Sequence, residues 1–369
     1  MQADYVIVGA GSAGCVLANR LTEDPATRVV LIEAGVRDWN PLIHIPAGFM
    51  KLLDHPNLTW GFKAEADPGT NGRAIPYRRG RVLGGSSSIN GLIYIRGQPE
   101  DFDHWAQLGN RGWSWDDVLP YFKKAENWQG EASEPHGSGG FLTTSPMSEH
   151  PAACRAIIAA AQELGLEYRA DVNNLPPGVG DSIGWCQQTR GGRRRASAAR
   201  TYLKPATKRP NLQVITEALV HRVMFDGTRA TGVEFSRNGG SGSSIERADA
   251  ACEVILAAGA VGSPHLLQLS GVGDREVLAK SGHRGASCAS RGREELAGPL
   301  HHPHVLRSAG HRDVKRARPQ PFLRGRGAAL SRLGNGHADL QRLAVRRLGQ
   351  GAGGIGDPGC AMRLCPGEL

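Results

Sequence analysis

Apolar residues near the N-terminus follow the spacing of a strand, a helix and a second strand. Residues 6–8 (Val-Ile-Val) are apolar on both faces, as a central parallel strand must be. A second apolar run, residues 27–35, ends close to Glu33. Between the two runs, apolar side chains recur at helical spacing, at Ala13, Val16, Leu17 and Leu21. These segments predict a strand–helix–strand unit at the start of the chain.

The middle of the chain predicts a long excursion followed by two helices. Pro, Gly and Asn interrupt residues 36–80, which indicates a segment with little regular structure, of the kind that covers a cofactor in α/β enzymes. Ser114 and Asp117 have the spacing of a capping box and predict a helix start. Residues 151–165 form a second amphipathic helix that ends at Gly165.

The stretch from residue 211 to residue 271 predicts a return to the sheet. Apolar and polar residues alternate over residues 211–235 around Asp226-Gly227, which is a hairpin signal. Residues 253–271 then have the pattern of a buried strand, a turn and a helix. We therefore expect an α/β fold with a doubly wound, Rossmann-like domain and inserted segments of a second, α+β domain.

Composition divides the chain near residue 281. The chain has 369 residues, 40% of them hydrophobic, and a formal net charge of +9. Residues 281–369 hold 15 basic and six acidic side chains and so carry the whole excess, while residues 1–280 balance at 29 and 29. All seven Trp and all six Tyr precede residue 281. A tail so rich in Arg and Gly has too little apolar surface to build a core.

The seven cysteines include no CxxC pair, which argues against a disulfide framework and against a thiolate zinc site. Free thiols in a reducing compartment are the simpler interpretation. No signal peptide precedes the first strand, and no apolar run reaches membrane-spanning length. We expect a cytoplasmic protein with no metal site and no membrane span.

A glycine motif, Gly9-x-Gly11-x-x-Gly14, lies between the first strand and the first helix. Gly9 permits a tight turn, Gly11 lets the backbone approach a pyrophosphate, and Gly14 allows the helix to pack closely on the strand. Glu33 ends the second strand, where its carboxylate can accept hydrogen bonds from ribose hydroxyls. This setting favours a dinucleotide site over a structural glycine turn, but it does not separate FAD from NAD.

A second glycine cluster is "GRVLGGSSSING", residues 80–91. Its glycines and small hydroxyl residues supply free backbone N–H groups, which suit an anionic, electron-rich partner. The residues in and beside it are too apolar for a solvated linker: Val82, Leu83, Ile89, Leu92, Ile93, Tyr94 and Ile95.

Residues 80–128 ("GRVLGGSSSING…KKAENW") and 259–273 ("GAVGSPHLLQLSGVG") resemble the two signatures of the glucose–methanol–choline (GMC) oxidoreductases. The segments "NPLIHIPAGF" and "LTWGFKAE" are similar to the choline-dehydrogenase-like and aliphatic alcohol dehydrogenase branch of that family. The resemblance extends from Asp4 to Gly282.

The resemblance implies an FAD enzyme that oxidises a small primary alcohol to the aldehyde by hydride transfer to flavin N5, with the electron acceptor left open. Ser12 and Ala13 would meet the pyrophosphate, and the backbone of Val220 would contact the adenine edge. Some members carry a histidine joined covalently to the flavin where this chain has Ile89, so the FAD would be held non-covalently. The predicted cofactor-binding residues are Gly9, Gly11, Ser12, Ala13, Gly14, Glu33, Ala34, Val82, Gly84, Gly85, Asn90, Gly91, Ile93 and Val220.

The resemblance also implies a catalytic histidine, with a second His or Asn beside it, near the C-terminus of a longer chain. No motif in residues 1–282 supplies this base, so we assign no catalytic residue. The arginines at 193–195 are expected at the surface or at a domain edge, and Trp113 and Trp115 in the core. The isolated histidines are expected to be structural or exposed: His44, His55, His104, His136, His150, His221 and His265.

Residues 283–369 leave the family pattern. The string "REELAGPLHHPH" holds His301, His302 and His304 and suggests a metal or catalytic cluster. However, codons that encode Ala289–Pro303 can be read one base forward as Leu-Pro-Gly-Val-Gly-Lys-Asn-Trp-Gln-Asp-His-Phe-Ile-Thr, which the family would show here. We therefore predict a frameshift near residues 283–287, a disordered tail, and no chemistry at these histidines. Coding DNA that lacks this reading would contradict the prediction.

Two other classes of protein stay open. One is an NAD-dependent oxidoreductase, and the other is a non-catalytic nucleotide-binding protein whose basic tail binds a partner. The tail's lack of aromatic residues and of periodicity argues against nucleic-acid binding. Because the second domain would be incomplete, we expect little alcohol oxidation and poor solubility from an exposed apolar face.

Overall fold

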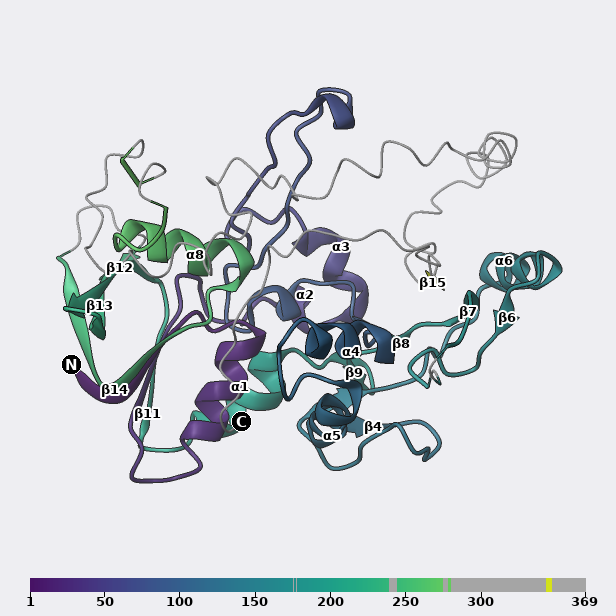
Figure 1. The fold of residues 1–369 in the computed structure, drawn as a ribbon, viewed down its shortest axis with the longest axis horizontal. Helices are drawn as coiled ribbons and strands as arrows, with labels where there is room; N and C mark the ends of the chain where they lie inside the picture. The colour runs from purple at the N-terminus through teal and green to yellow at the C-terminus, as the bar shows by residue number, and fades with distance from the viewer. Residues whose placement is uncertain (175, 177, 239–243, 275–277, 280–342, 347–369) are drawn as a thin grey trace.

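The computed structural model describes residues 1–174, 176, 178–238, 244–274, 278–279 and 343–346. A six-stranded sheet with the order β11-β2-β1-β14-β13-β12 lies at the left of Figure 1. Its strands are β1 (Gln2–Val8), β2 (Val29–Ile32), β11 (Leu212–Ile215), β12 (Ala218–Asp226), β13 (Arg229–Arg237) and β14 (Glu246–Leu256).

Four strands of this sheet are parallel and two are antiparallel. β1 lies between β2 and β14 and is parallel to both, and β11 extends the parallel part beyond β2. β13 and β12 are added to β14 as antiparallel strands. Helix α1 (Ser12–Leu21) connects β1 to β2. The predicted strand–helix–strand unit and the α/β fold class are confirmed.

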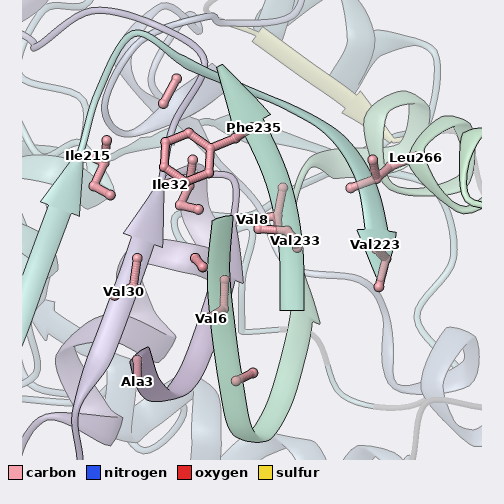
Figure 2. Packing of buried hydrophobic residues seen from close by; sticks show 13 residues of the cluster. Ala3, Val6, Val8, Val30, Ile32, Ile215, Val223, Val233, Phe235 and Leu266 are labelled. Carbon is pink, nitrogen blue, oxygen red and sulfur yellow. The ribbon is translucent and has the colours of Figure 1, made fainter. Parts of the chain in front are cut away.

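Side chains of β1 and β2 alternate between two cores, as the two-residue period of a strand requires. Val6, with 0% of its surface exposed, faces the core in Figure 2, which Phe235 and Leu266 help to fill. Leu266 belongs to helix α8 (Gly259–Leu269). Ile7 faces the opposite core, formed with α1, the π-helix η4 (Ala199–Leu203) and helix α7 (Lys204–Ala206). Burial on both faces explains why residues 6–8 are all apolar.

The alternating stretch at residues 211–235 divides into two elements. The hairpin around Asp226-Gly227 is confirmed as β12 and β13. Residues 212–215, however, form the separate edge strand β11, which pairs in parallel with β2. Glu217 breaks the stretch with a left-handed backbone, φ 56°. Because non-glycine residues rarely adopt this conformation, the sequence gives little sign of the break.

The excursion predicted for residues 36–80 holds short helices and a two-stranded arm. The helices are α2 (Pro41–His44), η1 (Pro46–Gly48), α3 (Phe49–Leu52) and η2 (Pro68–Thr70). Residues 59–80 form the arm, in which Thr59 pairs with Gly80 and Lys63 with Pro76. The arm rises at the top of Figure 1.

Among the remaining elements, α5, α6, β6 and β7 lie at the right of Figure 1. Helix α5 (Trp115–Ala125) begins at the predicted capping box, in which the Ser114 hydroxyl accepts from the Asp117 amide (3.3 Å) and the Asp117 carboxylate from the Ser114 amide (3.1 Å). Helix α6 (Ala152–Glu163) and its terminal Gly165, φ 89°, are also confirmed. The other elements are η3 (Gly85–Ser88), β3 (Ile93–Tyr94), α4 (Pro99–Gln107), β4 (Glu126–Trp128), β5 (Leu142–Thr144), β6 (Glu167–Tyr168), β7 (Ser182–Trp185), β8 (Gln187–Gln188), β9 (Arg190–Gly191) and β10 (Arg194–Arg195).

From the tail, the described part is β15 (Leu343–Arg346), which pairs antiparallel with β7. The other residues for which the sequence predicts disorder lie outside the described residues. His301, His302 and His304 lie outside them as well. Among the described residues, no helix is both long and apolar enough to cross a membrane. The thiols of Cys15, Cys154 and Cys186 are buried, and that of Cys252 is exposed.

Candidate functional site

The glycine turn between β1 and α1 uses its three glycines in different ways. Gly9 has φ +98°, and a Cβ there would lie 2.6 Å from the carbonyl oxygen of Ala257. A Cβ on Gly14 would lie 1.9 Å from the carbonyl oxygen of Gly9. Gly11 is extended (φ −75°), and its nearest neighbour would be 3.9 Å away. The fold itself therefore requires Gly9 and Gly14, whereas Gly11 leaves open space above the turn.

The N-terminus of α1 faces this space. Its N-cap residue, Gly11, provides no side-chain hydrogen bond, so the first amide groups of the helix keep their N–H donors free. Ser12 and Ala13 are exposed and Gly14 is buried. Free N–H groups together with the positive end of the helix dipole form a site for a phosphate group.

Glu33 follows β2 and reaches the same turn. Its carboxylate accepts hydrogen bonds from the amides of Ala10 and Gly35, both at 2.8 Å. Only 6% of its surface is exposed. Burial raises the pKa of Glu33 to about 7, although the two amide donors and the Arg81 charge favour the ionised form. The carboxylate keeps lone pairs for further donors, as a ribose-binding residue needs.

The second glycine cluster packs directly on the first. The Gly84 amide donates to the carbonyl of Ala10 at 2.7 Å, and a Cβ on Gly85 would lie 2.8 Å from the Cα of Gly11. Both glycines have positive φ, 86° and 53°. Two segments about 70 residues apart in the chain thus meet at the start of α1, and the second segment needs glycine at residues 84 and 85 to do so.

The serines of the second cluster stabilise its loop. The Ser87 hydroxyl donates to the carbonyl of Gly84 (2.5 Å), and the Ser88 hydroxyl to that of Leu83 (2.7 Å). The apolar residues Val82, Leu83, Ile89 and Leu92 are buried, with 0 to 5% of their surfaces exposed. The cluster is therefore a packed loop and not a solvated linker, as the sequence predicted.

The other predicted cofactor-binding residues differ in how exposed they are. Asn90 is exposed, Gly91 is half-buried, and Ile93 in β3 is 41% exposed. Ala34, next to Glu33, is half-buried. Val220 lies in β12, two residues beyond Ala218, whose amide donates to the carbonyl of Glu33 at 2.9 Å.

Arg195 is a site residue that sequence reasoning missed. The expectation of a surface position holds for Arg193 and Arg194 but is wrong for Arg195, which is 0% exposed. Its guanidinium donates to the side-chain oxygen of Asn90 at 2.6 Å and to the Asn90 carbonyl at 2.7 Å. A basic run gives no means of telling which arginine is buried. The one available signal is the adjoining run of small residues, 196–199, all buried.

His136 lies in a buried polar network with Glu126, Asp171 and Arg96. It bonds Glu126 (2.8 Å) and Asp171 (2.9 Å) and stacks on Trp128 at 4.0 Å. Glu126 also forms a buried ion pair with Arg96 (2.7 Å). The surroundings of His136 are those of a structural residue, in agreement with the prediction.

A cavity of about 400 Å³ lies beside the Glu33 end of the site. The amide of Glu217, which lines it, donates to the carbonyl of Gly35 at 2.9 Å. The predicted cofactor-binding residues do not line it. Its walls are Val36, Arg37, Trp39, Asn40, His55, Asn57, Leu58, Thr216 and Glu217.

Comparison with known proteins identifies the family. The model of the GMC oxidoreductase N-terminal region matches residues 3–285. The chain belongs to the GMC oxidoreductase family. This confirms the resemblance drawn from residues 80–128 and 259–273.

GMC oxidoreductases of known sequence are similar over three quarters of this chain. Mitochondrial choline dehydrogenase of Homo sapiens is 45% identical over 288 residues, 75% of this chain and 47% of that protein. Oxygen-dependent choline dehydrogenase of Brucella anthropi is 42% identical over 282 residues, 76% of this chain and 50% of that protein. The chain spans about half the length of the curated relatives it matches.

Solved GMC structures share the fold. Pyridoxine 4-oxidase from Mesorbium loti is 37% identical with a TM-score of 0.71, over 77% of this chain and 54% of that one. An FAD-dependent oxidoreductase from Chaetomium thermophilum is 32% identical with a TM-score of 0.70, over 77% and 50%. The expectation of FAD as the family's cofactor is confirmed, while the contact of each predicted residue with it stays a prediction.

Proposed function

We propose that this chain is the FAD-binding part of an oxidoreductase that converts a primary alcohol, choline-like or aliphatic, to the aldehyde. One observation carries the proposal: two glycine turns meet at the free N-terminus of α1, with the buried Glu33 carboxylate beside them. The choline dehydrogenases among the relatives support an alcohol substrate. The electron acceptor is left open.

The residues present fit FAD. The protein has room for a side chain at residue 11, yet the residue is glycine. A ligand that lies against the turn would explain this. The free amides of Ser12 and Ala13 would hold the pyrophosphate, and Glu33 would accept from the adenosine ribose. Val220 would meet the adenine edge with its backbone. Around the phosphates and the isoalloxazine we place Val82, Gly85, Asn90, Gly91 and Ile93, and we count Ala34 and Gly84 as further cofactor-binding residues.

When bound, the flavin supplies a hydride acceptor, N5, for the alcohol carbon. This chain's residues bind and orient the cofactor and exclude water from it. Ile89, which is 2% exposed, offers no nucleophile to the flavin ring, so attachment would be non-covalent. We assign no base for the hydroxyl proton to the described residues.

We propose further that residues 283–369 arise from a shifted reading frame and contribute no catalytic residue. The family match ends at residue 285, close to the predicted shift. On this view the chain binds FAD but lacks the histidine that the family's reaction uses. We place it in the cytoplasm, because its sequence has no CxxC pair and an odd number of cysteines, which does not suit a disulfide framework.

Cofactor analysis of the purified protein tests the proposal. The chain is expected to take up FAD in a 1:1 ratio and to release it intact on heat denaturation, where chromatography separates FAD from FMN and NAD. Binding of NAD in place of FAD would support the NAD-dependent alternative. A chain that binds neither nucleotide would overturn the proposal.

A further inference from the structure

Arg195 is a fully buried cation whose hydrogen bonds go to carbonyl and amide oxygens. Its Nε donates to the carbonyl of Ile43 at 2.8 Å. Its Nη1 donates to the carbonyl of Ser87 at 3.2 Å and to both oxygens of Asn90, at 2.6 and 2.7 Å. The rigid fork of a guanidinium thus connects α2 to the second glycine loop, which the point charge of a lysine would do less well.

The charge of Arg195 has no counter-ion in the described part of the chain. The buried cation is surrounded by dipoles alone, and its Nη2 lacks a hydrogen-bond partner among the described residues. Burial lowers the pKa of Arg195 to about 10, so the group is still charged near neutral pH. An unpaired buried charge costs several kcal/mol unless an opposite charge approaches it. A ligand with negative charge would provide that compensation.

The residues that Arg195 holds belong to the proposed cofactor site. Ser87 and Asn90 follow Gly85 in the same loop, and Gly85 packs against Gly11 at the start of α1. The Asn90 side-chain oxygen accepts from Arg195 and from the amide of Leu92 (3.2 Å), which leaves its NH₂ group to donate outward. Because low polarity strengthens charge interactions, a buried cation bonded to this loop favours an anion bound beside the loop.

We infer that Arg195 is the buried positive charge of the FAD site: it positions Asn90 and the glycine loop, and it compensates the negative charge of the bound pyrophosphate. This inference rests on the proposed function. Arg195 acts through Asn90 and through its field, so it is a positioning residue, and the exposed Arg194 beside it provides a matched control.

Three substitutions separate charge from hydrogen bonding. Arg195→Lys keeps the charge, Arg195→Gln keeps donors without the charge, and Arg195→Met removes both. We expect Lys to retain FAD affinity within about threefold, and Gln and Met to lose about tenfold or more, a change of about 1.4 kcal/mol or more. The Kd is measured by quenching of flavin fluorescence, and circular dichroism and melting of the FAD-free protein monitor folding.

The outcomes are distinguishable. Equal affinities in Arg195→Lys and Arg195→Gln, or FAD binding in all three variants as tight as in Arg194→Met, would overturn the inference alone. A wild-type chain that fails to bind FAD would overturn the proposed function and this inference with it.

A further variant tests for an uncompensated charge without changing Arg195 itself. Asn90→Asp gives the cation a carboxylate in place of an amide at 2.6 Å. The FAD-free protein is then expected to melt at a higher temperature while its FAD affinity falls, with Asn90→Ser as the comparison. A lower melting temperature than that of Asn90→Ser would count against an uncompensated charge at Arg195.

Discussion

The three glycines of the first motif are glycine for different physical reasons. Gly9 is needed for its backbone angle, and Gly14 because Gly9 itself occupies the place of its side chain. Gly11 has neither reason within the protein, since its φ suits any residue and no atom would lie closer than 3.9 Å to its Cβ. Under the proposed function, the bound cofactor would be the reason for glycine at this position.

This difference predicts opposite effects for two alanine substitutions. Gly11→Ala is expected to change the free energy of unfolding of the FAD-free protein by less than about 0.5 kcal/mol and to weaken FAD binding about tenfold or more. Gly14→Ala is expected to destabilise the FAD-free protein by about 2 kcal/mol or more, since its Cβ would lie 1.9 Å from a carbonyl oxygen. Urea unfolding and FAD titration measure the two effects. A Gly11→Ala protein with unchanged FAD affinity would contradict this assignment.

Some residues of the candidate site could be predicted from the sequence and others could not. Gly9, Gly14 and Glu33 could be predicted, because a turn between a strand and a helix restricts which residues fit there. Arg195 could not, since its burial depends on carbonyls of Ile43 and Ser87, more than 100 residues away in the chain. Hydropathy counts every arginine as exposed and carries no sign of such contacts.

At the scale of elements, a buried polar network joins segments that share no sheet. Arg96 follows β3, Glu126 begins β4, and His136 and Asp171 lie in loops. Burial by itself would lower the pKa of His136, but hydrogen bonds and charges from Asp171 and Glu126 outweigh it and raise the pKa to about 9. The pKa values of Glu126 and Asp171 are lowered by His136 and by other donors, despite the opposing effect of burial.

These shifts predict how stability depends on pH. The His136 contribution is fully present below its unfolded pKa of 6.5 and is lost as the pH rises through 9, because the folded state binds the proton more tightly. On the acid side, the Glu126 and Asp171 contributions are lost as the pH falls through their lowered folded values. Urea unfolding should therefore show wild-type stability falling by up to about 3 kcal/mol between pH 6.5 and 9.

Two histidine variants test the assignment of this slope. His136→Gln is expected to be less stable than wild type at pH 6.5 and to lose clearly less stability than wild type up to pH 9, the remainder coming from Glu33, whose raised pKa lies near 7. His221→Gln, on β12 outside the network, should keep the wild-type slope. An equal slope in His136→Gln and wild type would show that another group titrates.

Elements with a strict period could be predicted from sequence, and elements defined by their partners could not. β1, α1, α5 and α6 were expected because apolar spacing and capping residues specify them locally. The separation of β11 from β12 was not, because both strands alternate and the break depends on the backbone of Glu217. The short helices between residues 41 and 52 were missed because they have too few turns to show a period.

At the scale of the whole molecule, the chain carries a cofactor site without an assigned base. Residues 3–285 match the family, and in the described part His136, a histidine buried among carboxylates, has a structural role. We therefore expect a protein whose flavin is not reduced by alcohol.

Flavin reduction measures this directly. Under anaerobic conditions, choline or a short aliphatic alcohol is expected to leave the 450 nm absorbance of the bound flavin unchanged, whereas dithionite should bleach it. Bleaching by alcohol at a rate typical of enzymes, on the order of 10 s⁻¹, would refute the expected inactivity.

The pairing of β1 with β14 has a consequence for synthesis on the ribosome. Val6 pairs with Val254, which is made about 250 residues later, and Gly9 turns against Ala257. Some 250 residues must therefore be made before the central strand has both neighbours, and contacts so distant in sequence form slowly. Until then an apolar strand has one unpaired edge in the nascent chain, where chaperones or aggregation compete for it. The proposed cofactor site is thus completed late in translation, because the Gly9 turn is synthesised early and packs against Ala257, which is synthesised much later.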